Sequence, residues 1–237
     1  MKNEKSEYND NLAYHYKSLR PPLHQILLKR SLKDQKFESA LDIGCGTGNS
    51  TLELVKYCES VTGYDPNTAM IQRCEHHPKV GFTGKLSNLK ENYNLLVFFG
   101  SLHYINAKDF SLYEKKLKNG GFLLCADFEI LYNTILAKLE LYLTEIDYDH
   151  NKNLTSYNSK SFEITRIEKF KTLFYCNLSE LTHLLLSETF LRKKLIDKYD
   201  STHLFENLKE DLNSHYPNEK IAVEANQYYS FYKKCSP

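Results

Sequence analysis

The sequence predicts an α/β fold in which a parallel sheet is flanked by helices. From about residue 39 to residue 128, short apolar runs alternate with segments of helical periodicity, as is typical of strand–helix–strand units. The run Tyr93–Phe99 is apolar through its centre, as expected for a strand that helices cover on both faces. Three closely spaced glycines directly follow the first apolar run and precede a helix pattern, which is a further mark of this fold class.

Seven strands are expected, five in the first part of the chain and two in the last part. They lie near residues 39–43, 60–65, 79–83, 93–99, 120–128, 162–174 and 220–232. The expected helices lie near residues 8–18, 22–33, 49–58, 67–76, 108–118, 130–147, 177–196 and 201–213. Pro21-Pro22 separates the first two helices, because proline can begin a helix but cannot continue one. Asn119-Gly120-Gly121 is expected to end the helix before it, and the polar residues 147–160 predict a loop.

The composition fits one compact domain and argues against several classes of protein. The chain has 237 residues and a formal net charge of +1, so it has no basic field that would attract nucleic acid or an anionic membrane. No apolar run approaches the roughly 20 residues that span a bilayer, and the first residues are polar, which predicts a cytoplasmic protein. The six cysteines include no C-x-x-C pair and predict free thiols. His76-His77 has no ligand partners at metal spacing, so no metal is expected.

The glycine turn has the features of a site for a nucleotide-like cofactor. The segment reads Leu41-Asp42-Ile43-Gly44-Cys45-Gly46-Thr47-Gly48, and glycine at these positions permits a tight turn and the close approach of a ligand. The following helix would direct its N-terminal N–H groups towards that ligand. The spacing G-x-G-x-G differs from the dinucleotide fingerprint G-x-G-x-x-G, and no lysine follows as in a phosphate P-loop. Asp42 suits a ligand that carries an ammonium group.

This segment resembles the first motif of the class I S-adenosylmethionine-dependent methyltransferases. The resemblance implies their Rossmann-like fold, a doubly wound, mostly parallel sheet of seven strands whose last strand lies antiparallel between the fifth and the sixth. It also implies S-adenosyl-L-methionine as the cofactor and S-adenosyl-L-homocysteine as its product. The cofactor-binding residues that it implies here are Asp42, Gly44, Cys45, Gly46 and Gly48.

A second motif ends the next expected strand. Asp65 lies at that end, where a carboxylate can accept hydrogen bonds from both hydroxyls of a ribose. Asp65-Pro66-Asn67-Thr68-Ala69-Met70 resembles the second motif of the family, which adds Pro66 and Met70 to the expected cofactor site. Asp65 could also cap the helix that begins at Pro66, and the two roles are compatible.

The segments that match the third and fourth motifs are Gly81–Leu89 and Phe98–Ile105. Family members often carry an acid or a small polar residue where this chain has Lys85, and an ammonium cannot accept from the adenine amino group. Adenine is therefore expected to contact the Leu86 backbone and the apolar side chains of the second motif. The fourth motif adds Phe99 and Gly100, and the methyl group is expected to meet its acceptor at this strand end.

The N-terminal segment Tyr16–Leu23 resembles the entry of small-molecule methyltransferases of the trans-aconitate and methyltransferase type 11 groups. The chain is expected to be one domain over residues 1–237, with a helical lid over about residues 1–35 and an inserted cap over about residues 129–161. Arg20 could hold the methionine carboxylate of the cofactor, an acid of the acceptor, or a carboxylate of the cap.

His103 and Tyr16 are the expected catalytic residues. His103 could act as a base, could orient the acceptor, or could only line the pocket by hydrogen-bonding the N-terminal segment. If the acceptor is a carboxylate, no base is needed, and donors such as Arg20, Tyr16 and Arg166 would position it.

The expected function is transfer of a methyl group from S-adenosylmethionine to a small-molecule acceptor, for example a carboxylate. A catalytically inactive S-adenosylmethionine-binding sensor or partner protein is the alternative that Lys85-Leu86 leaves open. A nucleic-acid or protein methyltransferase is disfavoured by the near-neutral charge and by Phe99-Gly100-Ser101-Leu102, which replaces the Asn/Asp-Pro-Pro-aromatic tetrapeptide of base-methylating enzymes. The glycine spacing disfavours a nicotinamide oxidoreductase. No nucleic-acid or membrane partner is expected, and the chain is expected to be a monomer or a homodimer.

Overall fold

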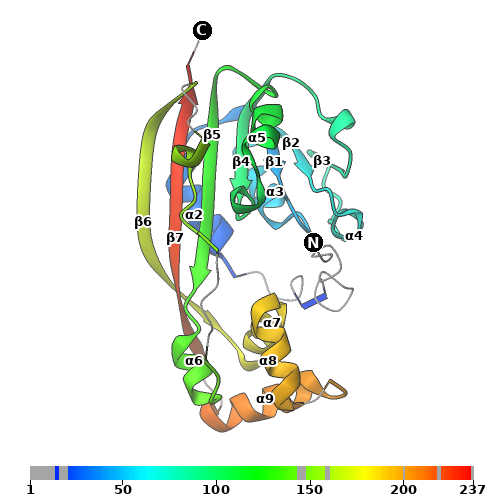
Figure 1. Ribbon diagram of the computed structural model, residues 1–237, viewed down its shortest axis with the longest axis vertical. Coiled ribbons are helices and arrows are strands. Elements are labelled where there is room, and N and C mark those ends of the chain that lie inside the picture. The colour runs from blue at the N-terminus through cyan, green and yellow to red at the C-terminus, as the bar shows by residue number, and fades with distance from the viewer. Residues whose placement is uncertain are drawn as a thin grey trace. The chain divides into compact units, whose positions relative to one another are not determined.

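The computed structural model of the protein describes residues 14–15, 21–142, 148–157, 161–199, 201–217 and 220–235. These residues form one sheet of seven strands in the order β3-β2-β1-β4-β5-β7-β6 (Figure 1). The strands are β1 (Phe37–Ile43), β2 (Cys58–Tyr64), β3 (Val80–Thr83), β4 (Tyr93–Phe99), β5 (Leu117–Ile130), β6 (Phe162–Cys176) and β7 (Ile221–Lys234).

The first five strands are parallel and β7 runs against its neighbours. β1 pairs in parallel with β2 and β4, β2 pairs with β3, and β4 pairs with β5. Glu129 of β5 contacts Asn226 of β7, and Leu131, directly after β5, contacts Glu224 of β7, so the residue numbers rise on one side as they fall on the other. β6 and β7 are also antiparallel, because Thr165 contacts Phe231 and Lys171 contacts Glu224. The expected α/β fold, with the last strand antiparallel between the fifth and the sixth, is confirmed.

The helices are shorter than the sequence pattern predicts. They are α2 (Leu23–Leu32), α3 (Asn49–Leu54), α4 (Thr68–Ile71), α5 (Ala107–Glu114), α6 (Asn133–Lys138), α7 (Leu178–Ser187), α8 (Thr189–Tyr199) and α9 (Leu204–His215). In the described part of the chain, the 3₁₀ turns are η2 (Leu86–Asn88), η3 (Leu102–Tyr104) and η4 (Leu154–Tyr157). The helix expected over residues 8–18 lies outside the described residues except at 14–15, and so does the segment 143–147 of the one expected over 130–147.

Two predicted boundaries are wrong. The single helix expected over 177–196 is two helices, because Glu188 has an extended backbone and Tyr132 donates a hydrogen bond to its carboxylate at 2.7 Å. Asn119-Gly120-Gly121 does not end a helix but lies in a bulge of β5. Tyr93 pairs with Leu117 and Leu95 pairs with Phe122, so β5 carries extra residues between two pairs of the ladder. Leu117 is buried and already belongs to the strand on the N-terminal side of the bulge.

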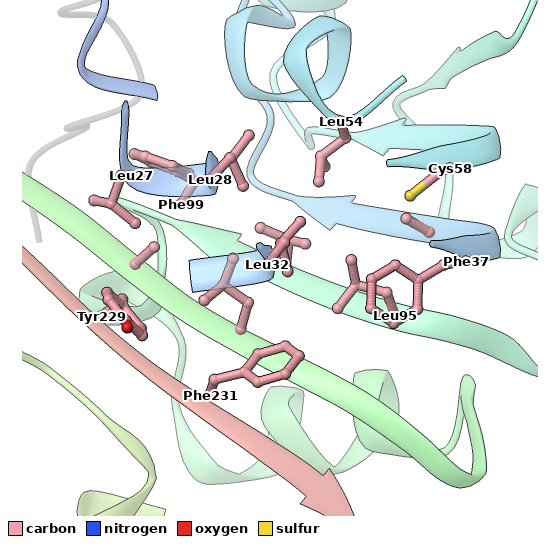
Figure 2. Close-up of a cluster of buried hydrophobic side chains, with 14 of the residues drawn as sticks. Leu27, Leu28, Leu32, Phe37, Leu54, Cys58, Leu95, Phe99, Tyr229 and Phe231 are labelled. Atoms are coloured by element: carbon pink, nitrogen blue, oxygen red, sulfur yellow. The ribbon is translucent and has the colours of Figure 1, made fainter. Parts of the chain in front are cut away.

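Hydrophobic side chains fill both faces of the sheet. Alternate residues of a strand point to opposite faces. Leu95, Val97 and Phe99 of β4 therefore join a cluster with Leu27, Leu28 and Leu32 of α2 (Figure 2). Leu96 and Phe98 join a second cluster with Phe110 and Tyr113 of α5. Helices thus cover the central strands on both sides, which leaves the strand ends as the place for a ligand.

The chain divides into two compact units. One comprises Pro22–Glu129, Tyr148–Phe170 and Asn226–Pro237 and contains the glycine turn, and the other comprises Met1–Pro21, Ile130–Asp147 and Lys171–Ala225. Residues 148–157 of the expected cap therefore belong to the unit of the glycine turn, whereas residues 130–147 belong to the other. The prediction of one domain with a lid and a cap stays a prediction.

The second unit is built around α7, α8 and α9, which pack against one another. All three helices carry buried leucines, which are Leu181, Leu184, Leu185, Leu191, Leu195, Leu208 and Leu212. A capping box starts α7, since the Asn177 side chain accepts from the Glu180 N–H and the Glu180 carboxylate accepts from the Asn177 N–H.

Candidate functional site

The glycine turn closes the carboxyl end of β1 against β2 and β4. The backbone N–H groups of Gly44 and Cys45 both donate to the Tyr64 carbonyl, at 2.8 and 3.0 Å. Gly44, Gly46 and Gly48 have φ values of +74°, +54° and +86°, which favour glycine. A Cβ at Gly44 would lie 2.4 Å from the Ser101 Cβ, and one at Gly48 would lie 2.7 Å from the ring of Phe82.

Gly46 is the point at which the turn faces open space. A Cβ built there meets no atom within 4 Å, in contrast to those at the two flanking glycines. The backbone N–H of Gly46 donates to Oδ2 of Asp65 at 2.9 Å, so the carboxylate lies beside this opening.

Asp65 joins the glycine turn to the segment that follows β2. Its Oδ1 accepts from the Asn67 N–H at 2.8 Å, while its Oδ2 accepts from Gly46. Burial raises the pKa of this carboxyl, and the two N–H bonds oppose that effect. Asp65 is not the cap of the next helix: Asn67 is, because its side chain accepts from the Ala69 N–H at 3.0 Å. Each carboxylate oxygen keeps a second lone pair for a further donor.

Asp42 lies beneath the turn and is fully buried. Its Oδ2 accepts from the hydroxyls of Ser50 and Thr51, both at 2.6 Å, which fixes the first turn of α3 against β1. Among the described residues, Oδ1 of Asp42 and Oγ1 of Thr47 are buried and have no hydrogen-bond partner. Burial raises the pKa of Asp42 to about 6. Contact of Asp42 with an ammonium group stays a prediction.

The residues expected around the adenine differ in exposure. Met70 and Cys45 are buried, Pro66 is exposed, and Leu86 at the start of η2 is 39% exposed. The thiols of Cys45 and Cys74 both reach the Gly46 carbonyl, at 3.8 and 3.5 Å. Burial and the neighbouring Cys74 raise the pKa of Cys45, so it is held as an uncharged thiol. Lys85 is exposed.

Phe99 and Gly100 at the end of β4 have different surroundings. The Phe99 ring is buried in the cluster between α2 and the sheet, with its centroid 4.4 Å from that of His24. Gly100 has a φ of +68°, and a Cβ there would lie 3.3 Å from Oδ1 of Asp127. The next residue, Ser101, donates to the Ile43 carbonyl, which places the end of β4 directly beside the glycine turn.

His103 lies in η3, next to this strand end. Its ring stacks on Tyr148 with centroids 4.5 Å apart, and its Nδ1 accepts from the Asp149 N–H at 3.3 Å. A neutral imidazole that accepts at Nδ1 carries its proton on Nε2. In this arrangement His103 is a hydrogen-bond donor at Nε2, which fits the expectation that it orients an acceptor better than the expectation that it acts as a base. Its ring also contacts the ring of the neighbouring Tyr104, with centroids 5.5 Å apart.

Residues 148–157 are attached to the turn after β4 through its carbonyl oxygens. The Tyr148 hydroxyl donates to the Gly100 carbonyl at 2.6 Å, and the Lys152 ammonium donates to that of His103 at 3.4 Å. The Tyr157 hydroxyl lies within hydrogen-bond distance of the carbonyls of Leu102 and Ile105, at 2.9 and 2.7 Å.

The sequence prediction missed Asp127 and His150. Oδ2 of Asp127 lies 3.1 Å from Nδ1 of His150 and 3.0 Å from the Tyr148 hydroxyl. Asp127 follows the apolar run Phe122–Ala126 as Asp65 follows Val61–Tyr64, and that repeated pattern could have identified it. His150 lies in a polar loop without periodicity, so no local signal identifies it.

Of the other predicted residues, two lie outside the described residues and one is placed away from this site. Tyr16 and Arg20 lie outside the described residues. Arg166 lies at the other edge of the sheet, where its guanidinium donates to Gln35 at 3.4 Å and lies 5.0 Å from the centroid of Phe231. Gln35 precedes β1, whereas the glycine turn follows it, so Arg166 cannot position an acceptor beside the turn.

A family model described as a methyltransferase domain matches residues 14–165, which is more than half of the chain. The chain belongs to this methyltransferase domain family. The match covers the glycine turn, Asp65, the end of β4 and Asp127–His150. The candidate site therefore lies within the part of the chain that matches the family model.

Two curated relatives carry methyltransferase names. A Dictyostelium discoideum protein is 27% identical over 122 residues, which are 48% of this chain and 46% of that protein. A Saccharomyces cerevisiae protein, CRG1, named as an S-adenosylmethionine-dependent methyltransferase, is 38% identical over 63 residues, which are 26% of this chain and 22% of that protein. The chain therefore matches less than half the length of each of these relatives.

Solved methyltransferase structures share the fold. A type II methyltransferase from Anaeromyxobacter dehalogenans has a TM-score of 0.61 and 13% identity, over 92% of this chain and 98% of that chain. Phosphoethanolamine N-methyltransferase 2 from Haemonchus contortus, in complex with phosphomonomethylethanolamine and S-adenosylhomocysteine, has a TM-score of 0.56 and 17% identity, over 98% of this chain and 59% of that chain. The same enzyme has a structure with S-adenosyl-L-methionine. Identities this low show likeness of fold alone.

In the described part of the chain, none of the helices is long and apolar enough to cross a membrane. Within the same residues, no group of three or more His, Cys, Asp or Glu side chains is placed to hold a metal ion. All six cysteines are thiols that form no disulfide.

Proposed function

We propose that the chain transfers a methyl group from S-adenosylmethionine to a small-molecule acceptor. The observation that carries the proposal is the opening at Gly46, with the Asp65 carboxylate beside it and the buried Asp42 beneath it. Membership of the methyltransferase family supports the reaction type. The Haemonchus contortus enzyme of similar fold binds S-adenosylmethionine and S-adenosylhomocysteine, which supports this choice of cofactor.

The residues at the opening fit an amino-acid nucleoside. Ribose hydroxyls can donate to the second lone pairs of Asp65, whose first lone pairs take the N–H groups of Gly46 and Asn67. The buried oxygens of Asp42 and Thr47 that lack partners are acceptors next to the same turn. The exposed side chain of Leu86 offers an apolar surface for a base. When bound, the cofactor would supply a methyl group already activated on a sulfonium sulfur.

The protein's own task is then orientation. Gly44 packs against Ser101, so the glycine turn and the end of β4 have a fixed separation, and a methyl group held at the first lies next to an acceptor held at the second. The Nε2–H of His103 is a donor on the acceptor side. The net charge of +1 supports a small molecule rather than a nucleic acid as the acceptor.

The first test is calorimetry with S-adenosylmethionine and with S-adenosylhomocysteine. We expect both to bind, and the Asp65→Ala variant to bind each about 10- to 100-fold more weakly, because a charged hydrogen-bond acceptor is removed. Thermal unfolding of Asp65→Ala separates a lost contact from a lost fold. Absence of binding to either compound at high micromolar concentration contradicts the proposal, and unchanged affinity in Asp65→Ala removes the ribose role of Asp65.

The second test fills the opening. Gly46→Ala adds a Cβ where no protein atom lies within 4 Å, so we expect a folded protein that binds S-adenosylhomocysteine at least about 10-fold more weakly. Gly81→Ala is the matched control, because its Cβ also meets nothing within 4 Å and lies in β3. Equal affinities of the two variants would show that the ligand does not approach Gly46. Binding without transfer to any acceptor would indicate a catalytically inactive sensor.

A further inference from the structure

The carboxyl edge of β5 carries an aspartate–histidine pair. Phe99 and Ala126 are the last residues paired between β4 and β5, so Asp127 is the first residue of β5 beyond that ladder. Oδ2 of Asp127 lies 3.1 Å from Nδ1 of His150. The side chain of Asp127 is 15% exposed and that of His150 is 32% exposed, so the pair is shielded but reachable.

The contacts of Asp127 determine which nitrogen of His150 carries the proton. Oδ1 accepts from the Phe128 N–H at 2.7 Å, and Oδ2 lies within hydrogen-bond distance of Tyr148 and His150. A carboxylate only accepts, so the proton of a neutral His150 is on Nδ1 and the lone pair is on Nε2. A histidine held this way by an aspartate can take a proton at Nε2 and is stabilised as an imidazolium. His103 has the opposite tautomer.

The aspartate–histidine pair lies beside the end of β4, where the proposed methyl transfer would reach its acceptor. A Cβ at Gly100 would lie 3.3 Å from Asp127, and the Tyr148 hydroxyl contacts both the Gly100 carbonyl and Asp127. The rings of Tyr148 and His150 have centroids 4.5 Å apart, and Tyr148 stacks on His103. The ring of Tyr148 thus contacts the rings of His103 and His150, and its hydroxyl contacts the end of β4.

We propose that His150 is the general base of the methyl transfer, positioned by Asp127, and that the acceptor atom enters with a proton, as a hydroxyl or an ammonium does. This inference rests on the proposed function. The acceptor loses its proton to Nε2 of His150, its lone pair forms the bond to the methyl carbon, and the electron pair of the breaking C–S bond stays on the sulfur of the donor. A carboxylate acceptor would make this pair unnecessary.

Other ionisable groups face the pair. Cys125, Lys152 and Tyr228 line a cavity of about 10 Å³ together with Asp127 and His150, which is room for about one water molecule. Glu129 accepts from Tyr228 at 3.2 Å, so its charge lies one contact further away. A pH profile of the reaction therefore needs the Lys152→Met variant beside the His150 variants, to assign an ionisation to His150.

The first experiment measures the tautomers without any reaction. The full chain is labelled with ¹⁵N-histidine, and two-bond ¹H–¹⁵N spectra are assigned with His150→Gln and His103→Gln. At neutral pH we expect a proton on Nδ1 of His150 and on Nε2 of His103, and loss of the His150 preference in Asp127→Asn. A proton on Nε2 of His150, or a charged His150 at neutral pH, overturns the proposal whether or not the chain binds S-adenosylhomocysteine.

The second experiment uses methyl-labelled S-adenosylmethionine with a panel of small alcohols, amines and carboxylic acids. We expect label in alcohols or amines, a loss of at least about 100-fold in the single-turnover rate of His150→Gln at pH 7, and partial recovery at high pH. We expect His150→Gln to bind S-adenosylhomocysteine with unchanged affinity. The exposed control His76→Gln should have an unchanged rate. Label that enters carboxylic acids at the same rate in His150→Gln overturns the proposal. If no compound of the panel takes up label, the tautomer measurement of the first experiment tests the proposal.

Discussion

The two oxygens of the Asp42 carboxylate have different surroundings. Oδ2 takes two short hydroxyl bonds from α3, whereas Oδ1 is buried and has no partner among the described residues. A charge in such a place is costly because it is removed from water, and that cost raises the pKa of the carboxyl. The ionised form of Asp42 therefore opposes folding. Its carboxylate nevertheless lies at the base of the glycine turn, where a ligand would be held.

Stability near Asp42 is expected to fall as the pH rises. Its pKa is raised from 3.8 in the unfolded chain to about 6 in the folded one, so the folded state binds more protons between these values, and about 3 kcal/mol of stability present below pH 4 is lost above pH 6. Urea unfolding at pH 4, 5, 6 and 7 should show this decline for the wild type relative to Asp42→Asn. Asp34→Asn, at an exposed site, is the control and should follow the wild type. Parallel curves for the wild type and Asp42→Asn would contradict the prediction.

The glycine turn depends on close packing as much as on backbone freedom. Ser101 from the end of β4 blocks a side chain at Gly44, and Phe82 from β3 blocks one at Gly48. The turn is therefore clamped between a side chain of β3 and one from the end of β4, which lie on opposite sides of β1 in the sheet. Gly46 is different, since its φ is positive but a Cβ built there meets no atom within 4 Å.

Substitution at the clamped glycines should destabilise the fold. Gly44→Ala and Gly48→Ala each combine a positive φ with a contact below 3 Å, so we expect losses of at least about 2 kcal/mol in the free energy of unfolding. Gly81→Ala has neither feature and should change stability by less than about 1 kcal/mol. Urea denaturation of the three variants measures this. The prediction fails if Gly48→Ala is as stable as Gly81→Ala.

At the scale of the molecule, two separate hydrophobic clusters of described residues cover the two faces of the central strands. Leu95 and Leu96 are neighbours in β4 and are both fully buried, yet one contacts the α2 side and the other contacts the α5 side. Their side chains share no cluster, because successive residues of a strand point to opposite faces.

The effects of emptying the two clusters should add. Leu95→Ala and Leu96→Ala are each expected to cost about 2–5 kcal/mol, and the double variant should equal their sum within about 0.5 kcal/mol. Unfolding in urea measures the three variants, with Leu112→Ala at an exposed position of α5 as the control. A coupling above about 1 kcal/mol would show that the two faces do not act independently.

Much of the fold and half of the site could be predicted from local pattern. The alternation of strands and helices, the glycine turn, Asp65 and the end of β4 are each marked by residues close together in the sequence. The helix boundary at Glu188 depends on Tyr132, which is 56 residues away, and so has no local signal. The pairing of Asp127 with His150 depends on how a polar loop folds back onto β5, and the tautomer of His103 depends on the N–H of Asp149 in the same loop.

The attachment of residues 148–157 to carbonyl oxygens has an evolutionary consequence. Every residue type offers a carbonyl, so the bonds from Tyr148, Lys152 and Tyr157 do not depend on which side chains follow Gly100. The 69% exposed Tyr104 can therefore be replaced while these hydrogen bonds remain. Evolution can thus vary the side chain at this exposed position without moving the loop.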